Sequence, residues 1–161
     1  NSKYAYDIDA NIMRLTLLKA ANAPDPIADL GVHHFSYALY PHSGSLQEGN
    51  VVEEAYAFNV PMMVESVDRH TGELSTLESF FSVDKPGVFI EAVKKAEKSD
   101  DTILRLYEGH SSRGDFQLES SLSYSSTQPA SMMEEEEGAS IGSNEVIDTI
   151  SPFEIKTYLM K

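Results

Sequence analysis

The chain has 161 residues, enough to bury a hydrophobic core. Its 26 acidic residues outnumber its 12 basic ones, and the net charge of −14 repels nucleic-acid phosphates and anionic membranes, so we expect neither as a partner. It has no cysteine, which excludes disulfides and thiolate zinc sites, and no apolar run approaches the roughly 20 residues that a transmembrane helix needs.

The first third of the chain predicts two strands and a helix. Residues 12–18 (IMRLTLL) alternate loosely and predict a strand, and residues 22–31, with two prolines and a glycine, predict a loop. Residues 33–40 (HHFSYALY) alternate again and predict a second strand, which Pro41 ends. Residues 51–58 have apolar side chains at helical spacing, so we expect one short helix there.

A long β-hairpin is the most distinct element. Residues 88–93 and 103–107 alternate between two faces with a period of two, which is the period of strands. The intervening residues 94–101 are almost wholly polar, as expected of a solvated tip. Large side chains stand on both faces of these strands, so we expect both faces to be covered, as in a module that packs onto a larger body.

The last third of the chain continues the β pattern. Further strands are predicted at residues 79–83, 116–122, 146–150 and 153–160. Residues 123–131, rich in Ser, Thr and Gln, predict a mobile loop, and the acidic residues 134–137 predict a solvated turn. Six or more strands with one short helix indicate an all-β fold, an antiparallel β-sandwich, which we expect to form a single domain over residues 1–161.

No catalytic or metal-binding pattern is evident in the residues themselves. The five histidines are His33, His34, His42, His70 and His110. Neighbouring residues of a strand point to opposite faces, so the first two cannot hold one ion together, and neither H-x-H nor H-E-x-x-H spacing occurs. With 26 acidic residues some pair is always close, so carboxylates alone do not indicate a glycosidase. We expect no catalytic residue, metal ligand or cofactor in this chain.

Aromatic residues and one arginine suggest how the core is built. Eight tyrosines without any tryptophan favour rings that pack in the core with paired hydroxyls, and a sugar-stacking platform is the alternative. Arg105 shares a predicted strand face with Ile103 and Tyr107, so its guanidinium should be paired, with Glu108 or Glu91 as the expected partner.

Several segments, taken in order, carry a resemblance that no single one of them would carry. They are NSKYAYD at 1–7, APDPIADLGVHHFSYALYPHSG at 23–44, AYAFNVPM at 55–62, VKKAEKSDDTILRLYEGH at 93–110 and SPFEIKTYLMK at 151–161. Together they resemble the C-terminal region of α-mannosidases of glycoside hydrolase family 38, in the cytosolic or fungal-vacuolar branch. Because the chain begins with Asn1 rather than Met, we expect it to be a fragment of such a polypeptide.

The resemblance implies a function for the parent enzyme and a supporting role for this chain. Family members hydrolyse terminal α-linked mannose with an aspartate nucleophile and a zinc ion held by two His and two Asp in an N-terminal catalytic barrel, and none of these residues maps here. The chain is therefore expected to be inactive alone. Its implied partners are that barrel, a mannose oligosaccharide and, in a homo-oligomer, further copies of the parent. The implied location is the cytoplasm or the lumen of a vacuole or lysosome.

The resemblance also implies one candidate substrate contact. Asn1, Lys3 and Tyr4 fall on the family's Asn/Asp-x-Lys-Tyr-Gly stretch near the rim of the active site, although Ala5 replaces the usual glycine. The alternative for this segment is a strand that docks onto its neighbour. The alternative function for the whole chain is an independent carbohydrate-binding or interaction module.

Overall fold

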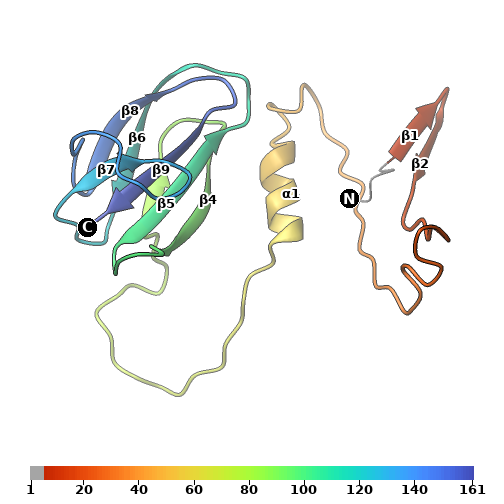
Figure 1. Cartoon of the computed structure of the whole chain (residues 1–161), viewed down its shortest axis with the longest axis horizontal. Helices are drawn as coiled ribbons and strands as arrows, with labels where there is room; N and C mark the ends of the chain where they lie inside the picture. Colours follow the sequence, from red (N-terminus) through yellow and green to blue (C-terminus); the bar gives the residue numbers. More distant parts are fainter. Residues whose placement is uncertain (1–5) are drawn as a thin grey trace. The chain divides into compact units, whose positions relative to one another are not determined.

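The computed structural model describes residues 6–161 (Figure 1). Contacts within the chain group it into two compact units, one that ends at His42 and one from Ser43 to Lys161. Each unit is described by itself below. The single domain expected over residues 1–161 stays a prediction.

The first unit contains one β-hairpin, formed by β1 (Tyr6–Asp9) and β2 (Ile12–Leu15). The two strands are antiparallel, and Arg14 Nη1 donates to Asp7 Oδ2 across them at 2.8 Å. The strand predicted over residues 12–18 is therefore confirmed only as far as Leu15, and β1 was not predicted.

The strand predicted over residues 33–40 is wrong, since this segment has no regular secondary structure. Its alternation is real, but alternation stabilises a strand only where a neighbour completes the hydrogen-bond ladder and covers one face. Neither occurs here, and the side chains that should form the buried face stay exposed, with Phe35 at 47%, Tyr37 at 71% and Leu39 at 78%.

The second unit is an antiparallel β-sandwich, which confirms the predicted fold class. One sheet has the strand order β3-β6-β8 and the other β4-β5-β9-β7, and all paired strands are antiparallel. The strands are β3 (Phe81–Val83), β4 (Val88–Lys95), β5 (Thr102–Glu108), β6 (Gly114–Ser120), β7 (Thr127–Ala130), β8 (Glu145–Ile150) and β9 (Ile155–Met160).

The main hydrophobic core contains side chains from both sheets. Its buried members are Val88, Leu104, Leu106, Phe116, Leu118, Val146, Ile150, Tyr158 and Met160. A smaller cluster comprises Ala96, which directly follows β4, together with Ile103 of β5, Ala130 of β7 and Leu159 of β9. The four-stranded sheet is thus covered on parts of both faces, as the large side chains on both faces of β5 predicted.

The predicted hairpin is formed by β4 and β5, with one irregularity. The pairing runs from Val88↔Glu108 to Lys95↔Thr102, but the register shifts between Ile90 and Ala92. Glu91 is therefore the extra residue of a β-bulge, a feature that re-aims a side chain at the surface of a sheet.

The loop predicted over residues 123–131 holds for residues 123–126 and is wrong for Thr127–Ala130, which form β7. A proline lacks the N–H that an inner strand must donate, so Pro129 argues against an inner strand and not against an edge strand. β7 is at the edge of its sheet, paired only with β9 among the named strands of residues 6–161, which is where a proline is tolerated.

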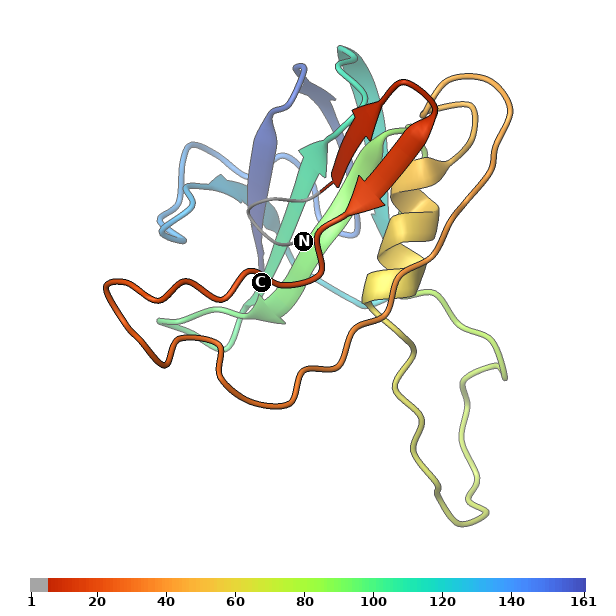
Figure 2. The same cartoon turned by 90° about the vertical axis from the view of Figure 1, so that its right-hand side faces the viewer.

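The helix expected over residues 51–58 is confirmed as α1 (Val51–Asn59). Figures 1 and 2 show it, in yellow, beside the green strand β4. Residues 60–80, which link α1 to β3, form a long excursion without helix or strand (Figure 2).

Candidate functional site

The substrate contact predicted from the resemblance cannot be followed further. Asn1, Lys3 and Tyr4 lie outside the described residues. Within residues 6–161, no group of three or more His, Cys, Asp or Glu side chains is arranged to hold a metal ion.

A groove of about 700 Å³ on the four-stranded sheet is the candidate site. It is lined by Tyr56 of α1, by residues of β4, β5 and β9, and by residues of three loops. The lining residues are Tyr56, Glu91, Arg105, Leu106, Tyr107, Glu108, Gly109, Met132, Phe153 and Ile155. A cavity of this size with few polar groups is typical of a binding site.

Helix α1 forms one wall of the groove through a single tyrosine. The Tyr56 hydroxyl donates to Glu91 Oε2 and lies 3.0 Å from the Tyr107 hydroxyl, which in turn can donate to it. The Tyr56 ring stacks on Phe89 with centroids 6.0 Å apart, and Phe89 contacts Tyr107 at 5.3 Å. Burial, helped by the hydrogen bond to Glu91, raises the pKa of Tyr56 above its usual value, so this hydroxyl remains a donor at neutral pH.

The bulge in β4 explains how Glu91 reaches this helix. As the extra residue of the bulge it has no pairing partner on β5, so its carboxylate is turned toward Tyr56 rather than held in the regular alternation of the strand. Arg105, on the neighbouring strand, was expected to pair with Glu91 or Glu108, and that expectation is wrong.

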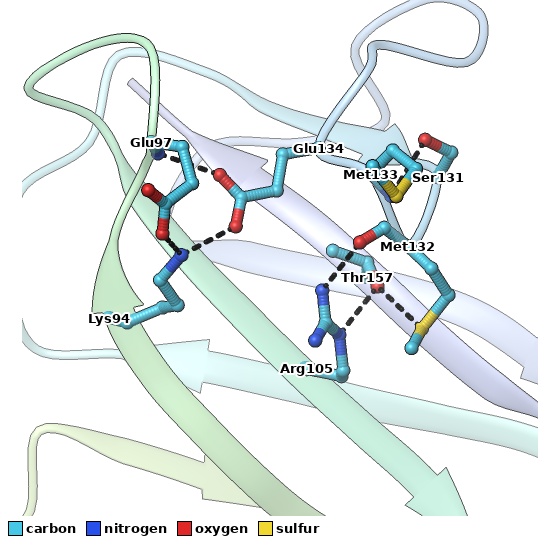
Figure 3. Close-up of polar contacts among 8 residues, drawn as sticks. All are labelled: Lys94, Glu97, Arg105, Ser131, Met132, Met133, Glu134 and Thr157. Carbon is cyan, nitrogen blue, oxygen red and sulfur yellow. Dashed lines mark hydrogen bonds and ion pairs between the residues drawn. The ribbon is translucent and has the colours of Figure 1, made fainter.

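Arg105 instead contacts the opposite wall, a segment that we call the strap (residues 131–137). Its Nε donates to Thr157 Oγ1 at 3.1 Å, and one Nη donates to the Met132 carbonyl at 3.2 Å (Figure 3). Two of its five N–H groups are thus used. The first joins β5 to β9, and the second holds the strap against β5.

A second fastening holds the strap at its centre. Lys94 Nζ donates to Glu134 Oε1 at 2.7 Å, and the Glu97 backbone N–H donates to Glu134 Oε2 at 2.7 Å (Figure 3). The hydrogen bond from Lys94, and after it the one from the Glu97 N–H, lowers the pKa of the Glu134 carboxyl. The Glu134 side chain is only 9% exposed, whereas Glu135 and Glu136 are 71% and 46% exposed. The solvated turn predicted for residues 134–137 is therefore wrong for Glu134 alone, since the other three residues are exposed.

Glu108 holds two loops in place at one end of the groove. This side chain is buried, and its carboxylate accepts hydrogen bonds from the N–H groups of His110, Ser112 and Phe153 and from the Ser112 hydroxyl, at 2.8–3.0 Å. Burial alone would raise the pKa of this carboxyl, but the four donors outweigh it and lower the pKa to about 2. The charge therefore ties two loops, residues 109–112 and 151–154, to the end of β5.

Phe153 is displayed at the rim by this arrangement. Its N–H is held by Glu108, its φ of 58° lies in the left-handed region, and its side chain is 68% exposed. Sequence analysis missed Phe153, because it was read as the first residue of a strand that begins at Ile155. The preceding Ser-Pro was a signal that the chain turns there.

The residues that line the groove do not include the free carboxyl pair that hydrolysis of a glycosidic bond requires. A glycosidase needs two carboxyl groups that flank the substrate. Of the two carboxylates that line this groove, Glu108 is engaged by four donors and Glu91 by the hydroxyl of Tyr56. The combination of aromatic rings, two carboxylates and one guanidinium suits contact with another molecule or with another part of a protein.

Comparison with known proteins decides the family. Residues 87–158 match the family model described as the glycosyl hydrolases family 38 C-terminal beta sandwich domain. The chain belongs to this family. The matched range runs from the start of the β4–β5 hairpin almost to the end of β9, so it includes strands of both sheets and leaves out β3.

Curated relatives align with nearly the whole length of this chain. Alpha-mannosidase 2C1 of Mus musculus is 36% identical over 166 residues, covering 99% of this chain and 16% of that protein. Alpha-mannosidase 2C1 of Homo sapiens is 37% identical over 164 residues (98% and 16%), and alpha-mannosidase G of Dictyostelium discoideum is 31% identical over 162 residues (97% and 15%). The chain thus spans about one sixth of the length of these relatives.

In the described part of the chain, none of the helices has the length and apolar character needed to cross a membrane.

Proposed function

We propose that this chain is a non-catalytic C-terminal domain of an α-mannosidase that hydrolyses terminal α-linked mannose of oligosaccharides. Its role is to support the catalytic barrel of the same enzyme. The observation that carries the proposal is the family match together with coverage: relatives named α-mannosidases align with 97–99% of this chain, which spans only 15–16% of their length.

The apolar side chains exposed on the second unit support a role beside a larger body. They include Met132 at 55%, Phe153 at 68% and Ile155 at 54% exposed. Large exposed apolar patches mark surfaces that other molecules cover. A supporting domain separated from its neighbour should look like this.

Zinc, which the family resemblance implies, does not fit the described residues, because no three potential ligands of residues 6–161 converge. We place the zinc site and the aspartate nucleophile in the catalytic barrel. The remaining expectations are part of the same proposal: a mannose oligosaccharide as substrate, a homo-oligomer of the parent, and location in the cytoplasm or in a vacuolar or lysosomal lumen.

An α-mannoside assay tests the proposal. The full-length protein should release the chromophore from a chromogenic α-mannoside, whereas residues 1–161 alone should release none, because bond cleavage is assigned to the barrel. Hydrolysis by the isolated chain, or none by the full-length protein under conditions in which it is folded and loaded with zinc, would contradict the proposal.

A carbohydrate-binding module is the second candidate function, and the groove is the observation that favours it. Its lining has two tyrosines, a phenylalanine, two carboxylates and a guanidinium, which are groups able to contact a sugar ring and its hydroxyls. Calorimetric titration with mannose oligosaccharides tests it. Saturable binding would favour the module, and its absence would favour the supporting domain.

A further inference from the structure

We propose that the groove is the place where the catalytic portion of the same polypeptide docks onto this domain. It does so by inserting an apolar side chain against Phe153, Ile155 and Met132. This inference rests on the proposed function and deepens it, since it names the contact surface and the chemistry of the occupant.

The backbone of Phe153 is the first reason. A bulky residue at a φ of 58° is strained, and such strain persists only where surrounding contacts impose it. Here the Glu108 carboxylate imposes it by accepting the Phe153 N–H at 3.0 Å. The ring is nevertheless 68% exposed, so within this domain its burial does not offset the strain. A buried charge therefore presents an aromatic ring to something outside the domain.

The residues around Phe153 are the second reason. Met132 and Ile155 line the same groove and are 55% and 54% exposed. Tyr107 and Arg105 lie beside them. Tyr, Phe, Met and Arg are the residue types enriched in protein–protein interfaces, where an aromatic anchor at the centre contributes most of the binding energy.

The polar groups of the groove are the third reason. The hydroxyls of Tyr56 and Tyr107 are engaged with Glu91 and with each other, and Arg105 is engaged with the strap and Thr157. A sugar, with hydroxyls all round its ring, would have to compete with these bonds. An apolar side chain would not, and the remaining lone pairs of Glu91 could accept a hydrogen bond from an N–H donor next to it.

Length and charge identify the occupant. About five sixths of each curated relative lies outside the part that this chain covers, so a large body is available in the same polypeptide. A second copy of this chain is less suited, because each copy carries a net charge of −14 and two such surfaces repel each other.

Two neighbouring methionines allow a direct test in the full-length protein. Met132 lines the groove, whereas Met133 is 76% exposed and is not among the lining residues. Under mild peroxide, Met132 should oxidise about tenfold more slowly than Met133, read out by tandem mass spectrometry. Met132 Sδ lies 4.0 Å from Thr157 Oγ1 within this domain, so the decisive comparison is between variants.

Phe153→Gly is the decisive variant, since it removes the ring and also relieves the strained φ. In the full-length protein it should raise the oxidation rate of Met132 about tenfold and leave that of Met133 unchanged. Phe153→Leu, which keeps an apolar anchor, should retain most of the protection. Ile147→Ala is the matched control, because it removes a comparably exposed side chain from the other sheet. Slow amide exchange in β5 would verify that each variant is folded.

Three results would overturn the inference. The first is equal oxidation rates of Met132 in the parent and in the Phe153→Gly variant. The second is protection that disappears on dilution, which would assign the groove to a second copy. The third is protection that appears only when a mannose oligosaccharide is added, which would assign it to a sugar. Failure of the proposed function is a separate result, namely absence of α-mannosidase activity from the full-length protein while Met132 remains protected.

Discussion

At the scale of single residues, Glu108 is the ionisable group with the largest expected effect on stability. Its pKa is about 2 in the folded chain against an ordinary value of 4.5, so its charge stabilises the folded state at any pH above 4.5. That contribution, on the order of 3 kcal/mol, is lost as the pH falls from 4.5 toward 2.

Glu108→Gln should therefore lower the free energy of unfolding at pH 7 by about 2–3 kcal/mol. An amide offers one acceptor oxygen where the carboxylate offers two, so part of the four-donor network is left unpaired. Denaturant unfolding measured from pH 7 to pH 2 checks this. The variant should lose less stability between pH 4.5 and pH 2 than the parent, and an identical slope for both would show that another group controls acid unfolding.

Gly142 occupies a position where the backbone leaves no room for a side chain. A Cβ at this position would lie 2.2 Å from the Glu145 carbonyl oxygen, a backbone atom that cannot rotate away. Gly142→Ala should shift the loop before β8, weaken the 2.7 Å hydrogen bond from the Thr127 N–H to the Gly142 carbonyl, and cost about 1–3 kcal/mol.

Gly72→Ala is the control for this prediction, because a Cβ there would have no neighbour within 4 Å and φ is not in the left-handed region. It should change the unfolding midpoint in denaturant by less than the equivalent of about 0.5 kcal/mol. Equal effects of the two substitutions would remove the steric explanation.

At the scale of elements, strand β8 separates a buried face from an exposed one. Ile150 is fully buried in the core between the sheets, whereas Ile147 on the same strand is 66% exposed. Ile150→Ala should cost about 2–5 kcal/mol of unfolding free energy, and Ile147→Ala should stay within about 0.5 kcal/mol of the parent. Chemical denaturation of both variants checks this, and similar losses would place the core elsewhere.

Periodicity predicts the elements that show a regular repeat in their own sequence. The β4–β5 hairpin, β8, β9 and α1 were all predicted, because each shows its own period over five or more residues. The edge strand β7 was missed because Pro129 signals a loop locally, although an edge position tolerates it. The opposite error occurred at residues 33–40, where a strand was predicted from alternation alone and no partner strand is present among residues 6–161 to pair with it.

The groove could not be predicted in the same way, because its contacts are distant in sequence. Tyr56 and Glu91 are 35 residues apart, and Arg105 and the Met132 carbonyl are 27 residues apart. Nothing in the local pattern shows that a bulge turns Glu91 toward a helix or that the strap crosses the sheet. The aromatic residues and Arg105 were recognised as candidates for pairing, but their partners depend on the topology of the sandwich.

At the scale of the whole molecule, the account assigns this sandwich a supporting role and leaves bond cleavage to another part of an α-mannosidase. A supporting domain controls the stability of the enzyme and leaves the chemical step unchanged. Loss of packing inside it should therefore affect the temperature at which activity is lost, whereas kcat at low temperature should not change.

The most direct measurement compares kcat and heat inactivation of the full-length enzyme with and without Ile150→Ala. The account predicts that kcat for a chromogenic α-mannoside at 25 °C stays within about twofold of the parent. The temperature of half-inactivation should fall by an amount on the order of 5–10 °C, and Ile147→Ala should leave both quantities unchanged. A large fall in kcat at 25 °C with unchanged heat inactivation would contradict the supporting role and place this domain in the chemistry itself.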